Sequence, residues 1–267
     1  MNLHKENSSQ FLLNNNQSQF SSDALADPVL VLGMHNSGTS MLTEILHKSG
    51  IFFGANMKHH ESHFFTVFIN DKLIMDGGDN WTQLPLMSIE EVLSFEDTIG
   101  PVIKNHWLID YLQWGYDGVS AWGIKDPRLC VLLPLYIKLF PGAKIVHIRR
   151  NPEDVAASLS GKYKAGVGVL NDFTHWKTLT EAYTERVLEY SDQCSGYIEL
   201  SYEEYCRDPK PQTRKLFQFL DLPFTDQTDL LLEKVTPNRI GSYERMIESQ
   251  THPLRSKLKS WLKGLLR

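Results

Sequence analysis

Cysteine is scarce in this chain of 267 residues, and long apolar runs are absent. The three cysteines, Cys130, Cys194 and Cys206, are far apart and form no Cys-x-x-Cys pair or Cys/His ligand set. Neither a disulfide framework nor a zinc site is therefore expected, and a reducing compartment is favoured. No stretch approaches the roughly 18 apolar residues of a membrane span. Because the N-terminal segment also lacks the apolar run of a signal peptide, we expect a cytoplasmic protein.

Positive charge is also not in excess, since the net charge is −5. A protein that binds nucleic acid broadly needs a basic face, so this class is disfavoured. Hydrophobic residues make up 42% of the chain, which is enough for a substantial core. Residues 1–26 are rich in Asn, Gln and Ser and predict a disordered leader. We expect residues 27–267 to form one domain, because no repeat or linker divides them.

Short apolar strands alternate with helical patterns along this domain. Such alternation predicts a parallel sheet with helices on both faces. Gly50 and Pro141-Gly142 mark the ends of the first two helices. The strands are expected at 28–33, 121–125, 144–148 and 198–200, and the helices at 39–48, 129–140, near Glu203 and at 210–220.

The first strand runs into a turn of small residues, Gly33-Met34-His35-Asn36-Ser37-Gly38-Thr39-Ser40, and a helix follows at once. Backbone N–H groups in such a turn point at one anion, aided by the helix dipole. Gly38 permits close approach, and the Thr39 and Ser40 hydroxyls are suited to phosphate oxygens. The glycines have the spacing of a P-loop, but Thr39 stands where its lysine belongs, which argues against a kinase. From this motif alone, phosphate binding and a plain βα connection are equally good interpretations.

A second basic segment follows the strand at 144–148. Arg149 and Arg150 leave the carboxyl end of that strand, where α/β sheets bind ligands. Pro152 suits the first turn of the next helix, and Ser158 lies two turns further on. An arginine fork with a hydroxyl matches a terminal phosphate, while a solvated arginine pair is the alternative interpretation.

Together the two segments resemble the sulfotransferases that use 3′-phosphoadenosine 5′-phosphosulfate (PAPS). In that family a strand–Ser-Gly-Thr–helix turn holds the 5′-phosphosulfate, and an Arg with a Ser eight residues later holds the 3′-phosphate. Arg150 and Ser158 have this separation. Lys125-Asp126-Pro127-Arg128, Tyr202-Glu203-Glu204 and residues 219–223 are similar to further family motifs. The resemblance covers roughly residues 28–225.

This resemblance implies a single-domain, P-loop-like α/β fold with a central parallel sheet of about five strands flanked by helices. It implies PAPS as the donor and 3′-phosphoadenosine 5′-phosphate (PAP) as a product. The donor-binding residues that it implies are His35, Asn36, Ser37, Gly38, Thr39, Ser40, Arg150, Ser158 and Tyr202.

One position departs from the family pattern. The residue before Ser-Gly-Thr is usually Arg or Lys, and here it is Asn36. A cation at this place neutralises the oxygen that gains charge as the sulfuryl group leaves. His35, Lys125 and Arg128 are the candidates to supply that charge instead. A non-catalytic member that binds nucleotide without turnover stays an alternative.

The resemblance also suggests the base that accepts the acceptor's proton. Hormone and phenol sulfotransferases use a His in Lys-Thr-His, which is absent here because Lys125 is followed by Asp126. Heparan-type members use a Glu in Glu-x-His-Phe-Phe, which residues 61–65 match. Glu61 is our first choice and His63 our second, and His59 and His60 belong to the same pool. A solvated polar helix start is the alternative, and no third ligand accompanies the histidines for a metal.

Several other side chains are candidates for the acceptor side. Asn70 and Asp71 are expected to line the cleft. The tryptophans at 81, 107, 114 and 122 form either an apolar acceptor pocket or, more commonly for such residues, part of the core. Residues 254–267 have an amphipathic helical pattern, which suits docking on the core or, as the less common case, a membrane surface or a partner.

The sequence therefore predicts transfer of a sulfuryl group from PAPS to a hydroxyl or amine of a small molecule. Tailoring of a natural product is one setting that suits this reaction. No metal and no nucleic acid are expected, and a homodimer is left open. The rival functions are a P-loop small-molecule kinase that uses ATP and a binding protein that has lost turnover.

Overall fold

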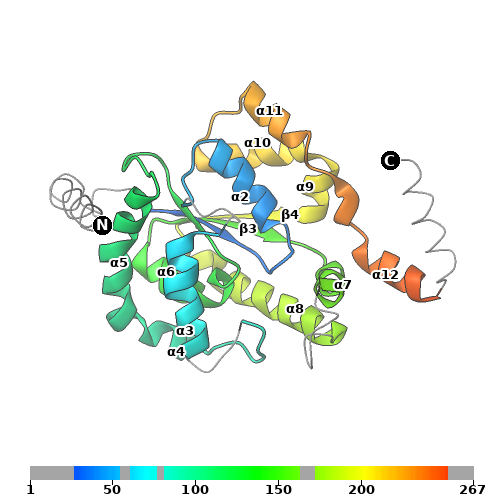
Figure 1. Ribbon diagram of the computed structural model, residues 1–267, viewed down its shortest axis with the longest axis horizontal. Helices are drawn as coiled ribbons and strands as arrows, with labels where there is room; N and C mark the ends of the chain where they lie inside the picture. Colours follow the sequence, from blue (N-terminus) through cyan, green and yellow to red (C-terminus); the bar gives the residue numbers. More distant parts are fainter. Residues whose placement is uncertain (1–26, 55–60, 77–80, 163–171, 252–267) are drawn as a thin grey trace, which may run out of the picture.

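Four parallel strands form the centre of the molecule (Figure 1). The computed structural model describes residues 27–54, 61–76, 81–162 and 172–251. The strands are β1 (Val29–Leu32), β2 (Gly123–Lys125), β3 (Lys144–Arg149) and β4 (Gly196–Ser201), in the order β2-β1-β3-β4. The predicted α/β class and parallel sheet are confirmed. The described residues contain four strands rather than the expected five or so, and the expected leader at 1–26 and helix at 254–267 lie outside them.

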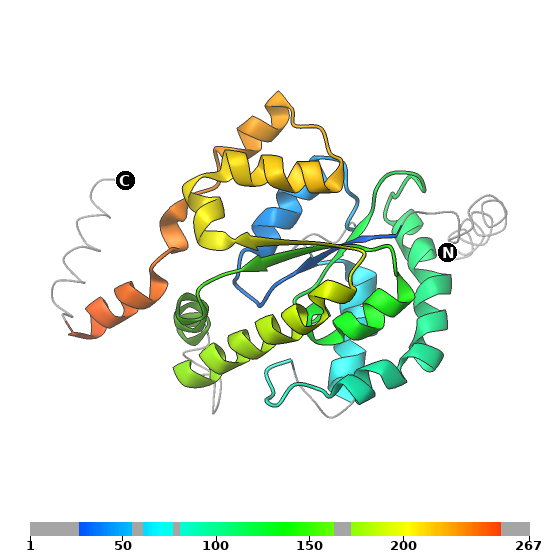
Figure 2. The same cartoon turned by 180° about the vertical axis from the view of Figure 1, so that it is seen from behind.

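Helices cover both faces of the sheet (Figure 2). One face carries α2 (Thr39–Lys48), α9 (Tyr202–Arg207), α10 (Pro209–Leu220) and α11 (Asp226–Leu232). The other carries α3 (Asp71–Asp76), α4 (Ile89–Ser94), α5 (Glu96–Gln113), α6 (Leu129–Leu139) and α8 (Phe173–Tyr190). The remaining elements are α7 (Pro152–Lys162), α12 (Ser242–Thr251), the π-helix η2 (Phe64–Asn70) and the 3₁₀ turns η4 (Ser191–Gln193) and η5 (Pro237–Arg239). Among these helices none is both long and apolar enough to cross a membrane.

Strand β1 is buried on both sides, which explains its continuous apolar sequence. Val29 and Val31 face the core beneath α2 and α10, whereas Leu30 and Leu32 face the core beside α6 and α8. The strand pairs with β2 and β3 at once. Because all four strands are parallel, their carboxyl ends meet at one edge of the sheet, where the polar segments follow.

Most of the predicted elements are present with small shifts at their ends. Helix α2 has the predicted bounds, and α7 begins at Pro152, as expected. No element was predicted between residues 49 and 120, where the structure has η2, α3, α4 and α5. Helix α5 went unpredicted because Gly100 and Pro101 interrupt its pattern; the structure nevertheless keeps Pro101 inside an 18-residue helix. Tertiary packing decides this segment.

An aromatic cluster joins α5 to β2. The rings of Trp107 and Trp122 are stacked with centroids 3.6 Å apart and planes 12° apart. Tyr111 meets both edges-on, and its hydroxyl donates to the Gly123 carbonyl at 2.9 Å. Both tryptophans are buried. The cluster therefore fixes the strand that ends in Lys125, and Trp107 and Trp122 belong to the core rather than to an acceptor pocket.

Loss of this stack is expected to be costly for stability. Trp107→Ala removes a buried ring and leaves a cavity, so the free energy of unfolding should fall by about 3–5 kcal/mol. Trp114→Ala is the matched control: Trp114 is 43% exposed, and its loss should cost less than about 1 kcal/mol. Urea unfolding followed by circular dichroism measures both. Equal losses in the two variants would contradict this assignment of the core.

Candidate active site

The turn after β1 has the backbone shape of an anion-binding loop. Gly33, Asn36 and Gly38 have φ angles of 149°, 65° and 106°, values that favour glycine or asparagine. A side chain at Gly33 would collide with the Ile148 carbonyl, and one at Gly38 with the Tyr202 ring. Helix α2 begins directly after the turn. Its first N–H groups and dipole are therefore directed at whatever lies in front of the turn.

One hydroxyl of this turn, that of Ser37, is available to a ligand. Ser37 is buried, and its Oγ has no hydrogen-bond partner among the described residues. Thr39 is also buried, at the first position of α2, and Ser40 follows it. A buried hydroxyl without a hydrogen-bond partner is destabilising unless a ligand supplies that partner. An anion held by the neighbouring N–H groups would satisfy Ser37.

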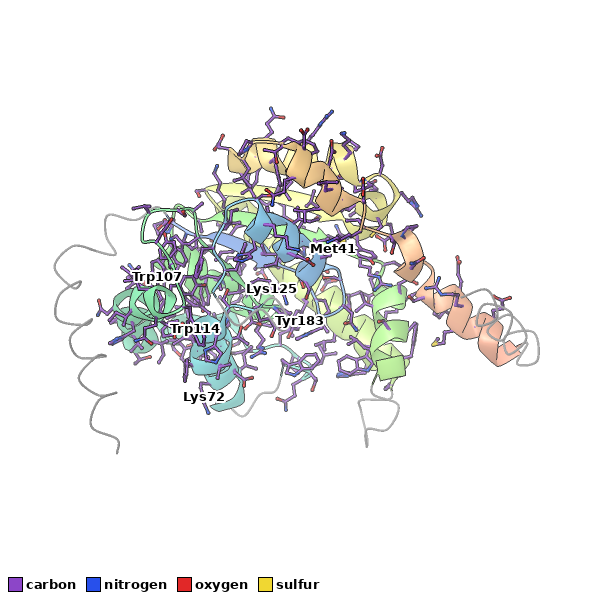
Figure 3. The ribbon with its side chains drawn as sticks, turned by 45° about the horizontal axis from the view of Figure 1, so that its top comes forward. Met41, Lys72, Trp107, Trp114, Lys125 and Tyr183 are labelled. Atoms are coloured by element: carbon purple, nitrogen blue, oxygen red, sulfur yellow. The ribbon has the colours of Figure 1, made fainter. Side chains whose placement is uncertain are left out.

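A cleft of about 440 Å³ opens beside the turn. This volume is in the range of small-molecule sites. Tyr202, at the start of α9, forms one wall, and Lys234 brings a positive charge to it. Figure 3 labels Met41, which extends the lining along α2. The cleft is lined by Asn36, Gly38, Thr39, Ser40, Met41, Glu44, Tyr202, Lys234, Val235, Thr236 and Asn238.

Arg150, which follows β3, and Ser158, which lies in α7, both contact the turn. Nη1 of Arg150 donates to the Asn36 carbonyl at 2.8 Å, and the Asn36 side-chain amide donates to Ser158 Oγ at 3.3 Å. The guanidinium also lies over the Tyr202 ring, 4.9 Å from its centroid. The two predicted phosphate motifs are therefore adjacent. Arg149 is not part of this group, because it pairs with Glu199 on the surface.

Residues at the start of α12 complete the group around Arg150. The sequence analysis did not predict this contribution of α12. Nη2 of Arg150 donates to Ser242 Oγ at 3.0 Å. The Asp154 carboxylate accepts from the backbone N–H groups of Gly241 at 2.7 Å and Tyr243 at 2.8 Å. Asp154 was noticed only as an acid favourable near a helix N-terminus. No local pattern indicates that residues 241–243 return to α7.

A buried ion pair lies at the end of β2. Lys125 Nζ is 3.1 Å from Glu61 Oε1, with the lysine side chain 2% and the glutamate 20% exposed. Ser62 fixes this geometry, because its N–H donates to the Lys125 carbonyl and its Oγ accepts from the Lys125 N–H, both at 3.2 Å. Burial lowers the pKa of the Lys125 ammonium, against the opposing effect of Glu61. The structure thus brings together two of the predicted catalytic residues.

Arg128 is tied into a second, mainly structural network. It is paired with Asp126, and its Nη1 donates to Asp71 Oδ1 at 2.9 Å. Asn70 donates to Asp126 at 3.1 Å and accepts from Tyr136 at 2.6 Å. Asn70 is fully buried and so holds this network instead of lining a cleft. Asp71 keeps a side chain that is 49% exposed.

The histidines separate in the structure. The His35 ring lies against Trp81, with centroids 4.2 Å apart and planes tilted by 43°. The His63 ring lies against Phe68 and Trp114, with centroids 5.3 and 5.9 Å away. Near it, burial raises the pKa of the Asp110 carboxyl while His63 lowers it. No contact among the described residues joins His63 to the Glu61–Lys125 pair. His59 and His60 lie outside those residues.

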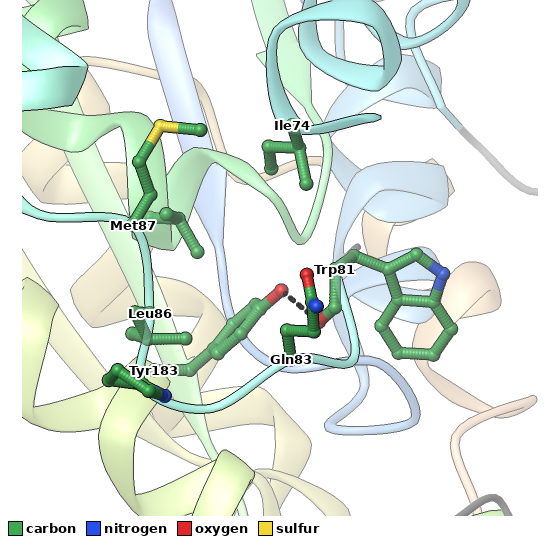
Figure 4. Close-up of a pocket in the computed structure, with 8 residues that line it drawn as sticks. Ile74, Trp81, Gln83, Leu86, Met87 and Tyr183 are labelled. Atoms are coloured by element: carbon green, nitrogen blue, oxygen red, sulfur yellow. Dashed lines mark hydrogen bonds between the residues drawn. The ribbon is translucent and has the colours of Figure 1, made fainter. Parts of the chain in front are cut away.

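Trp81 adjoins a small cavity with Tyr183 and residues 85–87 (Figure 4). Its volume is about 10 Å³, which is room for at most one water. It cannot hold an acceptor. Trp114 is labelled in Figure 3 and is half-exposed. The predicted tryptophan pocket is thus not formed: Trp107 and Trp122 stack on each other in the core, Trp81 lies against Trp176, and Trp114 lies against His63.

A parallel sheet whose first strand ends in a turn shaped to bind an anion, with an arginine just beyond the neighbouring strand β3, is typical of P-loop-like α/β folds. The sulfotransferase family profile matches residues 28–226. The chain belongs to this family, as the resemblance predicted. Among the described residues no cluster of three or more His, Cys, Asp or Glu is placed to hold a metal.

Several known proteins are similar to this chain. Protein-tyrosine sulfotransferase A of Caenorhabditis elegans is 31% identical over 118 residues, which is 39% of this chain and 30% of that protein. An uncharacterized protein of Aquifex aeolicus is 26% identical over 214 residues, or 75% of this chain and 26% of that protein. The chain spans about a quarter to a third of the length of these two relatives.

Solved structures share the fold. The sulfotransferase domain of the Synechococcus PCC 7002 olefin synthase has a TM-score of 0.52 at 15% identity, with 85% of this chain and 91% of that one covered. Sulfotransferase STF9 from Mycobacterium avium has a TM-score of 0.50 at 18% identity, with 84% and 71% covered. At such identities the likeness establishes the fold alone.

The turn itself can be tested by Gly38→Ala. The residue has φ 106° and faces the Tyr202 ring, so an added methyl group strains the backbone and displaces that ring. We expect PAP binding to weaken about 5- to 150-fold, since strain of this kind is worth about 1–3 kcal/mol. Isothermal titration calorimetry measures the affinity. Gly50→Ala, with φ 107° but open space around it, is the control; equal weakening in both variants would refute the close-approach argument.

Proposed function

We propose that this chain transfers a sulfuryl group from PAPS to a hydroxyl or amine of a small molecule. The observation that carries the proposal is the junction of Arg150 and Ser158 with the Asn36 segment of the turn. Arg150 and Ser158 offer a cationic group and a hydroxyl for one phosphate, and the neighbouring turn is suited to a second phosphate. A 3′,5′-bisphosphate nucleotide carries two phosphates that could occupy these two sites.

The residues present fit this donor. The unpartnered Ser37 hydroxyl and the N–H groups at the start of α2 suit the 5′-phosphosulfate. Arg150, Ser158 and Ser242 suit the 3′-phosphate. The cleft beside Tyr202 has the volume for the nucleoside. In exchange for its contacts to Asn36 and Ser242, Arg150 would gain the stronger charge-assisted bonds of a phosphate.

When bound, the donor supplies an activated sulfuryl group whose bond to the bridging oxygen breaks with the electron pair left on the 5′-phosphate. In this proposal Glu61 would accept the acceptor's proton as the new bond to sulfur forms. Lys125 holds this carboxylate in one position, and Ser62 fixes the backbone of both. Lys125 also brings positive charge to the end of β2, next to the turn where Asn36 brings none.

The kind of acceptor follows from access to the base. Because Glu61 is only 20% exposed, the group that loses its proton must reach into a recess. A small molecule meets this condition, and tailoring of a natural product is our suggested setting. The cysteines at 130, 194 and 206 are unpaired, which agrees with our proposal of a cytoplasmic enzyme. His63 is no longer our candidate base, because its ring faces α5.

Donor binding separates the proposal from its rivals. Arg150→Ala should weaken PAP binding by about 2–4 kcal/mol, or roughly 30- to 1,000-fold, because a buried charged donor is lost. Arg149→Ala, which removes an exposed arginine paired with Glu199, should bind PAP normally. Calorimetry with PAP and with Mg-ATP makes the comparison. Tight binding of Mg-ATP without binding of PAP would establish the kinase rival instead.

Turnover tests the base. Glu61→Gln keeps a hydrogen-bonding partner for Lys125 but cannot accept a proton, so PAPS turnover should fall about 10²- to 10⁴-fold. The matched control is Glu96→Gln, since Glu96 forms an exposed pair with Lys138 far from β2 in the fold. PAP formation is followed by chromatography with a panel of phenols, alcohols and amines. Full activity of the Glu61 variant would remove Glu61 from the role, and PAP binding without any turnover would identify a non-catalytic relative.

A further inference from the structure

A segment that the mechanism does not use is fastened firmly to α8. Tyr183 donates from its hydroxyl to the Trp81 carbonyl at 2.8 Å, the dashed bond in Figure 4. His175 Nε2 donates to the Thr82 carbonyl at 2.7 Å, and Arg186 Nη2 donates to the Met87 carbonyl at 3.0 Å. Three side chains of one helix thus hold the backbone of residues 81–87. A loop fixed at three points places its side chains accurately.

The side chain that this loop delivers to the turn is Trp81. One neighbour of its ring is the His35 imidazole at 4.2 Å, and another is the Trp176 ring at 5.7 Å and 28°. Trp176 is fully buried, so it does not shift easily, whereas Trp81 stays partly exposed. The buried Trp176 on α8 therefore limits the movement of Trp81, and Trp81 in turn limits the movement of the His35 ring. If Trp81 served only to pack the core, its contact with Trp176 would suffice, and its contact with His35 in the turn would not be needed.

His35 occupies a position where orientation matters. It follows Met34, which is buried and accepts the Ser37 N–H at 3.1 Å, and it precedes Asn36, which carries no charge. A hydrogen-bond donor acts strongly on developing charge only when its direction is fixed before the reaction. An aromatic contact at such a distance restricts the tilt of an imidazole.

We propose that Trp81 is a positioning residue for sulfuryl transfer. It holds the His35 imidazole in one orientation at the turn, so that a ring N–H of His35 donates to the transferring group and compensates in part for the neutral Asn36. This inference rests on the proposed function. It assigns to His35 the role of the donor and to residues 81–87 the role of its support.

Transfer to water tests the inference without knowledge of the acceptor. The water oxygen bonds to sulfur, the bond from sulfur to the bridging oxygen breaks with its pair left on the 5′-phosphate, and Glu61 takes the proton; the products are PAP and sulfate. Sulfate release is measured by ion chromatography for Trp81→Leu, His35→Ala and the double variant. If Trp81 acts through His35, the two effects are not additive.

We expect each single substitution to slow sulfate release about 10- to 100-fold, somewhat less than the loss of a whole oxyanion-type donor. The double variant should be within about threefold of the slower single variant. PAP affinity should change little, because the effect is on the transferring group. Trp81→Phe should restore most of the rate, since it keeps an aromatic ring, and Trp114→Leu should leave the rate unchanged.

Additive losses, or a normal rate in Trp81→Leu, would overturn the inference while leaving the proposed function intact. Absence of PAP binding and of sulfate release in the natural chain would instead refute the proposed function, and the inference with it. Circular dichroism shows whether Trp81→Leu folds. If it does not, His35→Phe provides the test, because this substitution keeps an aromatic ring against Trp81 and removes the hydrogen-bond donor. A normal rate in His35→Phe would also overturn the inference.

Discussion

The buried guanidinium of Arg150 is the group on which the arrangement of the site depends. Its side chain is 1% exposed, and a charge so far from water is stable only when its N–H groups are satisfied. The partners come from separate parts of the chain: the Asn36 carbonyl in the turn and the Ser242 hydroxyl at the start of α12, with the Asp154 carboxylate at 3.8 Å. The turn, α7 and α12 must therefore be in place together.

The need to compensate a buried charge also applies to Lys125, another buried cation near the turn. Lys125 is nearly as buried as Arg150, and Glu61 compensates it at 3.1 Å. The turn itself is neutral at Asn36, and positive charge comes from Arg150, which directly follows β3, and from Lys125, the last residue of β2. Where the family pattern has one cation on the turn, this chain has its cations at the ends of the two strands that pair with β1.

Much of the fold and part of the site were predictable because their causes are local. The apolar run of β1 and the glycines around α2 mark a buried strand and a short helix without any tertiary information. Arg150 was predictable because the ends of parallel strands meet at one edge. Ser242 was not, since its contact with Arg150 spans 92 residues with no pattern to announce it. Likewise, the sequence does not show that Ser62 pairs with the backbone of Lys125, the contact that brings Glu61 beside the lysine ammonium.

The double hydrogen bond of Asp154 to the start of α12 also bears on how the protein is made. Chains leave the ribosome N-terminus first, so β1, the turn and α2 emerge long before Gly241 and Tyr243. Until those two residues arrive, the carboxylate of Asp154 must stay in water, and Arg150 lacks its bond to Ser242. The sheet can thus form before residues 241–243 are made, but the group of contacts around Arg150 is complete only after they have left the ribosome.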